Sequence, residues 1–320
     1  MKPIALIKST LAAAAALLLG VSQASAQISP PEGTLPAALE GTISAITLND
    51  DGSVSMTVMG MPVSVPVGTP VTSPTAELTL SQLVDPTPLP GRTLPGFLGG
   101  TAIINGNATP EGIVTATDVF VEPSENVAIG AVTANTGTQI SVNGTPVVLL
   151  EDARIPAGPV KDANGIEILL SSIPVGTGAA IEGYYSEGTF YAFLIEADQG
   201  TPVNIQPQVV ITRALGRERT PNNRRGDEVE VRGTCTIPHA PTATTQDIRV
   251  FRVDSGVETL LGTGTAIVDP AVPGIAAYTF RTVTAPSTSP VLGACPTTVR
   301  VVNISPGANN ASATASVEVR

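Results

Sequence analysis

The residue types that usually carry enzyme chemistry are scarce in this chain. Its 320 residues include one histidine, two cysteines and no tryptophan, and only 13% of them are charged. The histidine, His239, lies in the segment IPHAP, so a two-histidine metal site is excluded and a Ser-His-Asp arrangement would have to use a residue in a proline-flanked loop. The remaining catalytic option is a set of scattered carboxylates, such as Asp118, Glu182 and Glu196. We therefore expect a protein that is not an enzyme and that binds no metal or cofactor.

Arginine is concentrated in one short region that could bind anionic groups. Residues 220–231 read TPNNRRGDEVEV and contain Arg-Gly-Asp, an adhesive recognition motif, at 225–227. Proline, asparagine and Gly-Asp are also typical of a turn, and a turn is the interpretation we adopt. The arginines form a solvated face, or they dock against the acidic repeats of this chain or against an anionic surface polymer. This candidate interaction patch consists of Arg213, Arg217, Arg219, Arg224 and Arg225.

Aromatic side chains are concentrated in residues 184–193, in a chain that is only 3% aromatic. Successive side chains of a strand point to opposite faces, so Tyr191 and Phe193 share one face and Phe190 lies on the other. One set should belong to the core, and the rest could hold a sugar ring or another small ligand. The candidate ligand platform consists of Tyr184, Tyr185, Tyr191 and Phe193.

Residues 1–26 have the features of a secretory signal peptide. The start is basic, residues 10–19 form a short apolar run, and Ala24-Ser25-Ala26 is the small-x-small pattern that signal peptidase accepts before Gln27. The apolar run is shorter than the roughly 20 residues that a spanning helix needs. We therefore expect an exported protein, periplasmic or extracellular, whose mature chain has no membrane span.

Charge divides the mature chain near residue 204. Residues 27–204 carry three basic and 18 acidic residues, a net charge of −15, whereas residues 205–320 carry 11 arginines and nine acidic residues, a net charge of +2. The segment between them, DQGTPVNIQPQ at 198–208, has the composition of a linker. Affinity for nucleic acid comes largely from cations that neutralise phosphates, so the acidic part argues against a nucleic-acid partner.

The acidic part contains an internal repeat that predicts two modules, 27–126 and 127–200. Gly60-Met61-Pro62-Val63 matches Gly144-Thr145-Pro146-Val147, and EGIVTATDVFVE at 111–122 matches EGTFYAFLIEAD at 187–198. Short β-branched runs between turn residues predict strands. Each copy reads as three strands, a leucine-bearing helical turn and a hairpin, an order that suggests a small, partly open barrel resembling an OB-fold.

The two copies resemble repeated modules of exported bacterial proteins that are classed as a domain of unknown function. The shared pattern is Gly-x-Ile/Val in the first strand and Gly-x-x-x-Ala-x-x-Val/Ile in the last. The resemblance covers residues 40–198 and implies no catalytic residues. The matching positions of the last strand are Gly112, Ala116 and Val119 in the first copy and Gly188, Ala192 and Ile195 in the second.

Residues 205–320 predict an immunoglobulin-like β-sandwich. Alternation from Glu228 to Arg232 marks a half-buried strand, and six or seven such strands fit a sandwich. The segments LLGTGTAIVD and VRVVNISPGANNASATASVEV resemble bacterial Ig-like modules of exported proteins, which implies a spacer or adhesive role. Because disulfides persist outside the cytoplasm, we expect Cys235 and Cys295 to be bridged, with a stabilisation of roughly 4 kcal/mol.

The sequence therefore predicts an all-β chain, with two small OB-like β-barrel repeats followed by an immunoglobulin-like β-sandwich. Its leading functional hypothesis is an exported, non-enzymatic envelope or extracellular protein whose modules act as structural, protein-interaction or adhesive units. The alternative is a protein that binds a glycan or small ligand at the second barrel. An enzyme built from the scattered carboxylates is the third.

Overall fold

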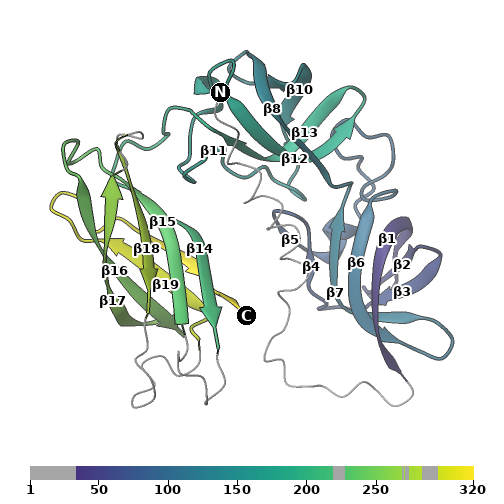
Figure 1. Cartoon of the computed structure of the whole chain (residues 1–320). Helices are drawn as coiled ribbons and strands as arrows, with labels where there is room; N and C mark the ends of the chain where they lie inside the picture. The colour runs from purple at the N-terminus through teal and green to yellow at the C-terminus, as the bar shows by residue number, and fades with distance from the viewer. Residues whose placement is uncertain (1–33, 219–227, 269, 271–273, 283–294) are drawn as a thin grey trace. The chain divides into compact units, whose positions relative to one another are not determined.

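The computed structural model describes residues 34–218, 228–268, 270, 274–282 and 295–320 (Figure 1). Within them, helix is limited to α2 (Leu80–Leu83) and the 3-10 turn η2 (Leu170–Ser172), so the predicted all-β class is confirmed. The described residues form two compact units: one contains 34–160 and Leu169–Thr201, and the other contains Lys161–Ile168 and Pro202–Arg320. The predicted signal peptide and the Arg-Gly-Asp tripeptide lie outside the described residues.

The first unit begins with a barrel whose sheet closes through a parallel strand pair. Its sheet order is β3-β2-β1-β6-β7-β4-β5, and β3 also pairs with β7. A capping box between Thr79 and Gln82 begins α2 before the final hairpin. A meander of three strands, a helix and a closing hairpin is the connectivity of an OB-fold. The strands are β1 (Leu35–Leu48), β2 (Val54–Val58), β3 (Met61–Val65), β4 (Val71–Thr72), β5 (Glu77–Leu78), β6 (Thr101–Ala108) and β7 (Val114–Glu122).

A second barrel in the same unit has the same strand connectivity. Its sheet order includes β10-β9-β8-β12-β13, and β10 pairs in parallel with β13. The turn η2 precedes β12 as α2 precedes β6. The strands are β8 (Asn126–Asn135), β9 (Ile140–Val142), β10 (Thr145–Leu149), β12 (Gly178–Ser186) and β13 (Thr189–Ala197), and β11 (Lys161–Asp162) lies in the other unit.

Each barrel has a β-bulge in the second strand of its last hairpin. The extra residues are Thr117 in β7 and Phe193 in β13, and a glycine lies across the strand pair at each bulge, Gly106 in β6 and Gly183 in β12. A Cβ atom on Gly106 would lie 2.2 Å from the carbonyl oxygen of Thr115, and one on Gly183 would lie 2.0 Å from that of Tyr191. The bend therefore needs a residue without a side chain, because the backbones approach too closely for a Cβ.

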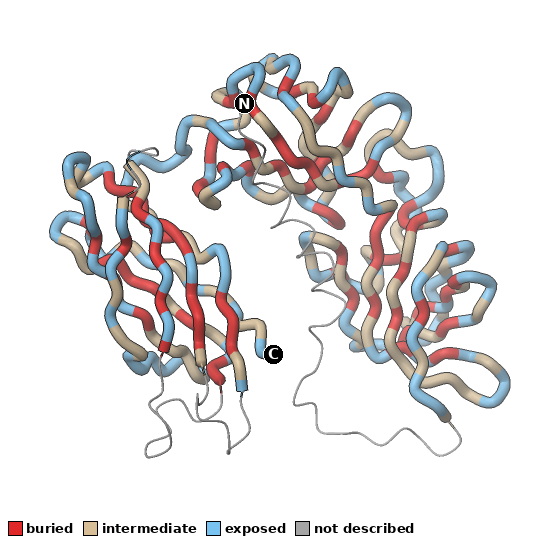
Figure 2. The backbone as a smooth tube through the Cα atoms, in the orientation of Figure 1, coloured by how far each residue is buried: buried red, intermediate tan, exposed pale blue. Residues whose placement is uncertain are grey.

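The two barrels share part of one hydrophobic core. Figure 2 shows the buried positions along both sheets. The cluster that fills the first barrel also contains Leu150, Ile155, Tyr184 and Phe193 from the second module. The barrels are therefore packed together rather than tethered only by the short linker between β7 and β8.

The other unit is a sheet wrapped around its own core. The strand order is β20-β19-β16-β17-β18-β15-β14-β21, and β14, near one end of this order, contacts β19 and β20 from the other. The inward-facing residues of these strands form one hydrophobic cluster, as expected when a sheet folds into a sandwich. The strands are β14 (Val209–Arg217), β15 (Glu228–Thr236), β16 (Thr245–Asp254), β17 (Val257–Val268), β18 (Ile275–Arg281), β19 (Thr298–Asn303), β20 (Ser312–Ser316) and β21 (Glu318–Val319).

The predicted disulfide is wrong, because the strand register separates the two cysteines. Cys235 lies opposite Val209. The Sγ atom of Cys295 lies 3.1 Å from a Cβ built on Gly216, and Gly216 pairs with Val229. Val229 precedes Cys235 by six residues, about 20 Å along a strand, whereas a disulfide needs Cα atoms within about 7 Å. Cys235 is instead a buried thiol, and burial raises its pKa to about 12.

Candidate functional site

The predicted tyrosine platform is mostly interior. Tyr184 is only 1% exposed. Its ring stacks on that of Tyr191, with centroids 5.2 Å apart and planes 17° apart, and its hydroxyl donates a 2.7 Å hydrogen bond to the carbonyl oxygen of Pro90 in the first barrel. Phe193 is buried in the shared core, and Tyr185 alone is well exposed. The platform assignment is therefore wrong for Tyr184 and Phe193, which are buried where the two barrels join, whereas the half-buried Tyr191 and the exposed Tyr185 remain a prediction.

A buried arginine adds a polar part to the same junction. Arg154, from the second module, is 3% exposed and binds both carboxylate oxygens of Asp152, at 2.8 and 2.7 Å. Its Nη1 donates to the carbonyl oxygens of Asp85 (3.2 Å) and Thr87 (2.8 Å) in the first module. Burial alone would raise the pKa of Asp152, but the hydrogen bonds from Arg154 lower it. Both groups therefore remain charged and hold the loop that starts at Asp85.

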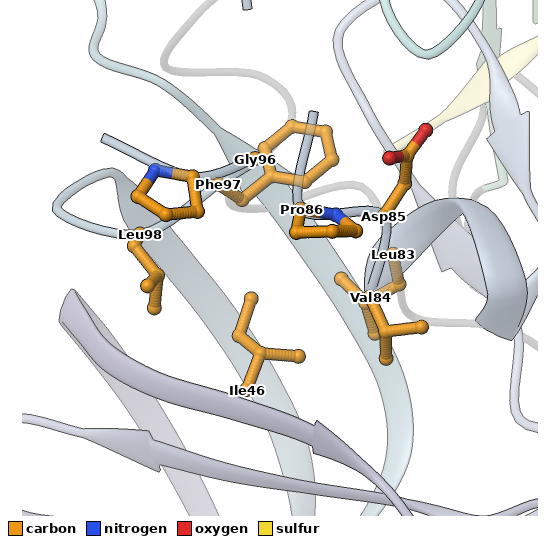
Figure 3. Close-up of a pocket in the computed structure, with 9 residues that line it drawn as sticks. Ile46, Leu83, Val84, Asp85, Pro86, Gly96, Phe97 and Leu98 are labelled. Atoms are coloured by element: carbon orange, nitrogen blue, oxygen red, sulfur yellow. The ribbon is translucent and has the colours of Figure 1, made fainter. Parts of the chain in front are cut away.

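A small pocket lies in the first module beside this loop (Figure 3). Its volume is 110 Å³, and eight of its nine lining residues are uncharged and apolar or glycine. Asp85 is the one charged lining residue; its carboxylate accepts a 2.8 Å hydrogen bond from the amide of Thr87. In Figure 3 that carboxylate points away from Ile46 and Leu98. The lining residues are Ile46, Leu83, Val84, Asp85, Pro86, Pro95, Gly96, Phe97 and Leu98.

Of the three carboxylates proposed for an enzyme, Asp118 lies in the first barrel, and Glu182 and Glu196 lie on neighbouring strands of the second. Asp118 lies on β7, where it accepts a 2.9 Å hydrogen bond from Asn105. Glu182 lies on β12 of the second barrel, and burial, together with the charges of Glu125 and Glu196, raises its pKa. Among the described residues there is no group of three or more His, Cys, Asp or Glu side chains that could hold a metal ion.

Glu122, at the end of β7, should make stability depend on pH. It is 7% exposed, and burial, Glu125 and Glu40 raise its pKa from 4.5 to about 7. Between these values the folded chain binds more protons than the unfolded chain, so the contribution of Glu122 to the free energy of unfolding falls as pH rises. We expect Glu122→Gln to match wild type near about pH 4 and to exceed it by about 2–3 kcal/mol near about pH 8.

Urea unfolding at the two pH values measures this difference. The exposed Glu77→Gln is the matched control and should change stability little at either pH. The same stability gain for Glu122→Gln at both pH values would contradict a raised pKa for Glu122 in the folded chain.

The sandwich carries arginines on the outer face of β14, β15 and β18. Strand register places Arg213 opposite Arg232 and, one row along, Glu230 opposite Arg281. Glu230 is only 2% exposed; its Oε1 lies 2.5 Å from Arg232, and its Oε2 contacts Arg281. Burial alone would raise the pKa of Glu230, but these two guanidinium groups lower it. Glu230 therefore stays ionised and orders both arginines.

A second carboxylate completes this charged face. Glu228 lies 3.6 Å from both Arg217 and Arg281. Arg213 makes no ion pair within the part of the chain that the structure describes, and it faces the like charge of Arg232. We call Arg213, Arg217, Arg232 and Arg281 the arginine face; with two carboxylates its net charge is +2.

The sequence identified only half of this face. Arg213 and Arg217 belong to the predicted patch, whereas Arg219, Arg224 and Arg225 lie outside the described residues. Arg232, seven residues after Arg225, was left out of the patch, and Arg281 is far from it in sequence. The alternation of buried and exposed residues in β15 and β18 could have placed Arg232 and Arg281 on an outer face. Only the strand register shows that both lie near the arginines of β14.

Comparisons with known proteins do not name a family. No family model matches the chain, and no curated protein matches it. Among solved structures, the chain is similar to FdeC, a broadly conserved Escherichia coli adhesin, at 13% identity over 90% of this chain and 88% of that one, with a TM-score of 0.20. So low a TM-score carries no conclusion about fold or function. No described helix is long and apolar enough to cross a membrane.

Proposed function

We propose that this chain is an exported interaction protein, non-enzymatic, in which the β modules form the framework and the arginine face binds an anionic polymer. Export is supported by the leader-like residues 1–26. The observation that carries the binding role is Arg213, an exposed guanidinium that faces Arg232 across the strand pair. Like charges directly opposite each other destabilise a sheet, and an anion shared between them would remove that cost.

The shape of the face fits an extended partner with repeated negative charges. Arginines on neighbouring strands are about 5 Å apart, and successive rows on one face are about 7 Å apart. An extended chain of carboxylates or phosphates can follow such rows. A compact ligand would need a concave site, and the arginine face lies on the outer side of a sheet.

The test is binding of polyglutamate and of polyphosphate to the intact mature protein at two salt concentrations. We expect both to bind, with weaker binding at high salt because of screening. Arg213→Ser should weaken binding about threefold to tenfold, as expected for loss of about 1 kcal/mol, and should not lower the melting temperature, because it removes the like charge opposite Arg232. Preference for one polymer would identify carboxylate or phosphate as the natural group.

Arg249→Ser is the matched control. Arg249 is exposed on β16, opposite Thr263 and Val302 and away from the arginine face, and its loss changes the net charge equally. It should leave binding nearly unchanged. Equal weakening by both variants would show a general charge effect, and no binding of either polymer by the wild type would contradict the proposed role.

A further inference from the structure

One side of the arginine face is bordered by a short segment that precedes the turn η2 in sequence. This segment, Lys161–Ile168, belongs to the same compact unit as the sandwich, and we call it the finger. The hydroxyl of Thr234 on β15 donates a 3.0 Å hydrogen bond to the carbonyl oxygen of Asn164. A Cβ built on Gly165 would lie 2.7 Å from Cγ1 of Val210 on β14. The tip of the finger therefore lies on both strands.

The finger lies on the same side of the sheet as the arginines. Cys235 packs in the core of the sandwich, so Thr234 and Arg232 point outward, because successive side chains of a strand alternate. Thr234 is nevertheless only 7% exposed, and the carbonyl group of Asn164 lies against its hydroxyl. Arg232, about 7 Å further along β15, lies opposite Arg213. The finger therefore closes the arginine face on the side of this arginine pair.

The tip of the finger is held in one conformation by its own hydrogen bonds. The carboxylate Oδ1 of Asp162 accepts the backbone N–H groups of Asn164, at 2.9 Å, and Ile166, at 2.8 Å. The N–H of Gly165 donates to the carbonyl oxygen of Asp162 at 2.8 Å. Because these donors are already used, the tip forms a wall beside the arginine face and does not extend it.

We propose that the arginine face binds the end of an anionic polymer, an inference that rests on the polymer binding proposed above. A polymer that meets all four guanidinium groups must run along the strands, because Arg213 and Arg217 are four residues apart on β14. Along this line it reaches the finger beside Arg213. An internal stretch of polymer would have to bend away from the sheet there, whereas a chain end can stop.

The charges beside the finger also suit an end group. Of the facing pair Arg213 and Arg232, only Arg232 has a carboxylate partner, Glu230, among the described residues. The last residue of polyglutamate carries two carboxylates that are both ionised at neutral pH, and a terminal phosphate has a charge of about −1.5 to −2. An internal unit of either polymer carries one charge. The ligand chemistry is therefore a doubly charged terminal group.

The test is the number of molecules of the intact mature protein that bind to each polymer chain, measured by sedimentation velocity with chains of several lengths. We expect one molecule per polyglutamate chain, which has one carboxylate end, and two per long polyphosphate chain, whose ends are alike. Neither number should rise with length. Amidation of the polyglutamate C-terminus should weaken binding about fivefold, as expected for loss of one exposed charge contact.

Asp162→Ala tests whether the finger is the cause. The N–H groups of Asn164 and Ile166 would lose their acceptor, so the wall should loosen and long polyglutamate should bind several molecules per chain. Glu167→Ala is the matched control, since it removes the same charge from an exposed position of the same finger. It should bind as wild type does. Far-UV circular dichroism checks that each variant is folded.

The outcomes separate this inference from the proposed function. Binding by the wild type in proportion to chain length would overturn end recognition and leave polymer binding standing. No binding of any chain would overturn both. The same number of bound molecules for Asp162→Ala and Glu167→Ala would show that the finger does not restrict the face, and would overturn the inference as well.

Discussion

Gly183→Ala should lose about 3 kcal/mol or more of folding stability, as expected where a well-packed site cannot relax. A Cβ there would lie 2.0 Å from the carbonyl oxygen of Tyr191 and 2.8 Å from the Cα of Ala192. Both obstacles are backbone, so β12 and β13 would have to separate. Urea unfolding of the intact chain measures the loss. Gly106→Ala should be similarly costly, because its Cβ would lie 2.2 Å from the carbonyl oxygen of Thr115.

Gly176→Ala is the control that separates the cost of a steric clash from the cost of a positive φ angle. Gly176 has φ of +91° and nothing within 4 Å of a Cβ, so alanine there costs about 1–2 kcal/mol of conformational strain alone. Losses for Gly183→Ala and Gly106→Ala no larger than this would show that the bulges can relax. Unequal losses at the two bulges would show that the barrels differ in how tightly their hairpins are packed.

Arg154→Met should cost about 3–5 kcal/mol, the usual result of removing one partner of a buried ion pair. Asp152 would keep a charge without its counter-ion, and two carbonyl oxygens of the loop that starts at Asp85 would lose their donor. The loss should appear in the free energy of unfolding of the two-barrel unit. Arg300→Met is the control: its pair with Glu258 is partly exposed, and such pairs contribute about 0–1 kcal/mol.

A double variant tests the cause of the loss at Arg154. Asp152→Asn with Arg154→Met removes the uncompensated charge, so it should be more stable than Arg154→Met alone. Equal stability of the single and double variants would mean that the carbonyl contacts, rather than the charge of Asp152, account for the loss.

Local sequence was sufficient to predict where the strands and turns lie. Alternating apolar residues and positive-φ turn positions, such as Glu187-Gly188 with φ of 49° and 87°, depend on neighbours a few residues away. The all-β class and the order of three strands, helical turn and hairpin could therefore be predicted. The pairs Gly112/Gly188 and Ala116/Ala192, matched from sequence, occupy corresponding places: each glycine has positive φ, and each alanine pairs with a bulge glycine.

The burial of the tyrosines depended on a partner distant in sequence. Alternation assigns Tyr191 and Phe193 to one face of β13, but it does not say what covers that face. Tyr184 is buried because Pro90 and the first-barrel core lie against it. No local pattern records that contact, so the sequence could not show that Tyr184 and Phe193 belong to the junction between the barrels.

The positions of the cysteines and arginines also could not be predicted from local sequence, because they depend on the register between strands. The predicted export and the presence of two cysteines favoured a disulfide between Cys235 and Cys295. Strand pairing instead places Cys235 opposite Val209 and Cys295 beside Gly216, at the far end of β14. Register likewise adds Arg232 and Arg281 to Arg213 and Arg217. Sequence by itself determined which residues alternate inward and outward, because that period is local. Only the tertiary structure decided which of them meet, because register is set by the packing of whole strands around the core.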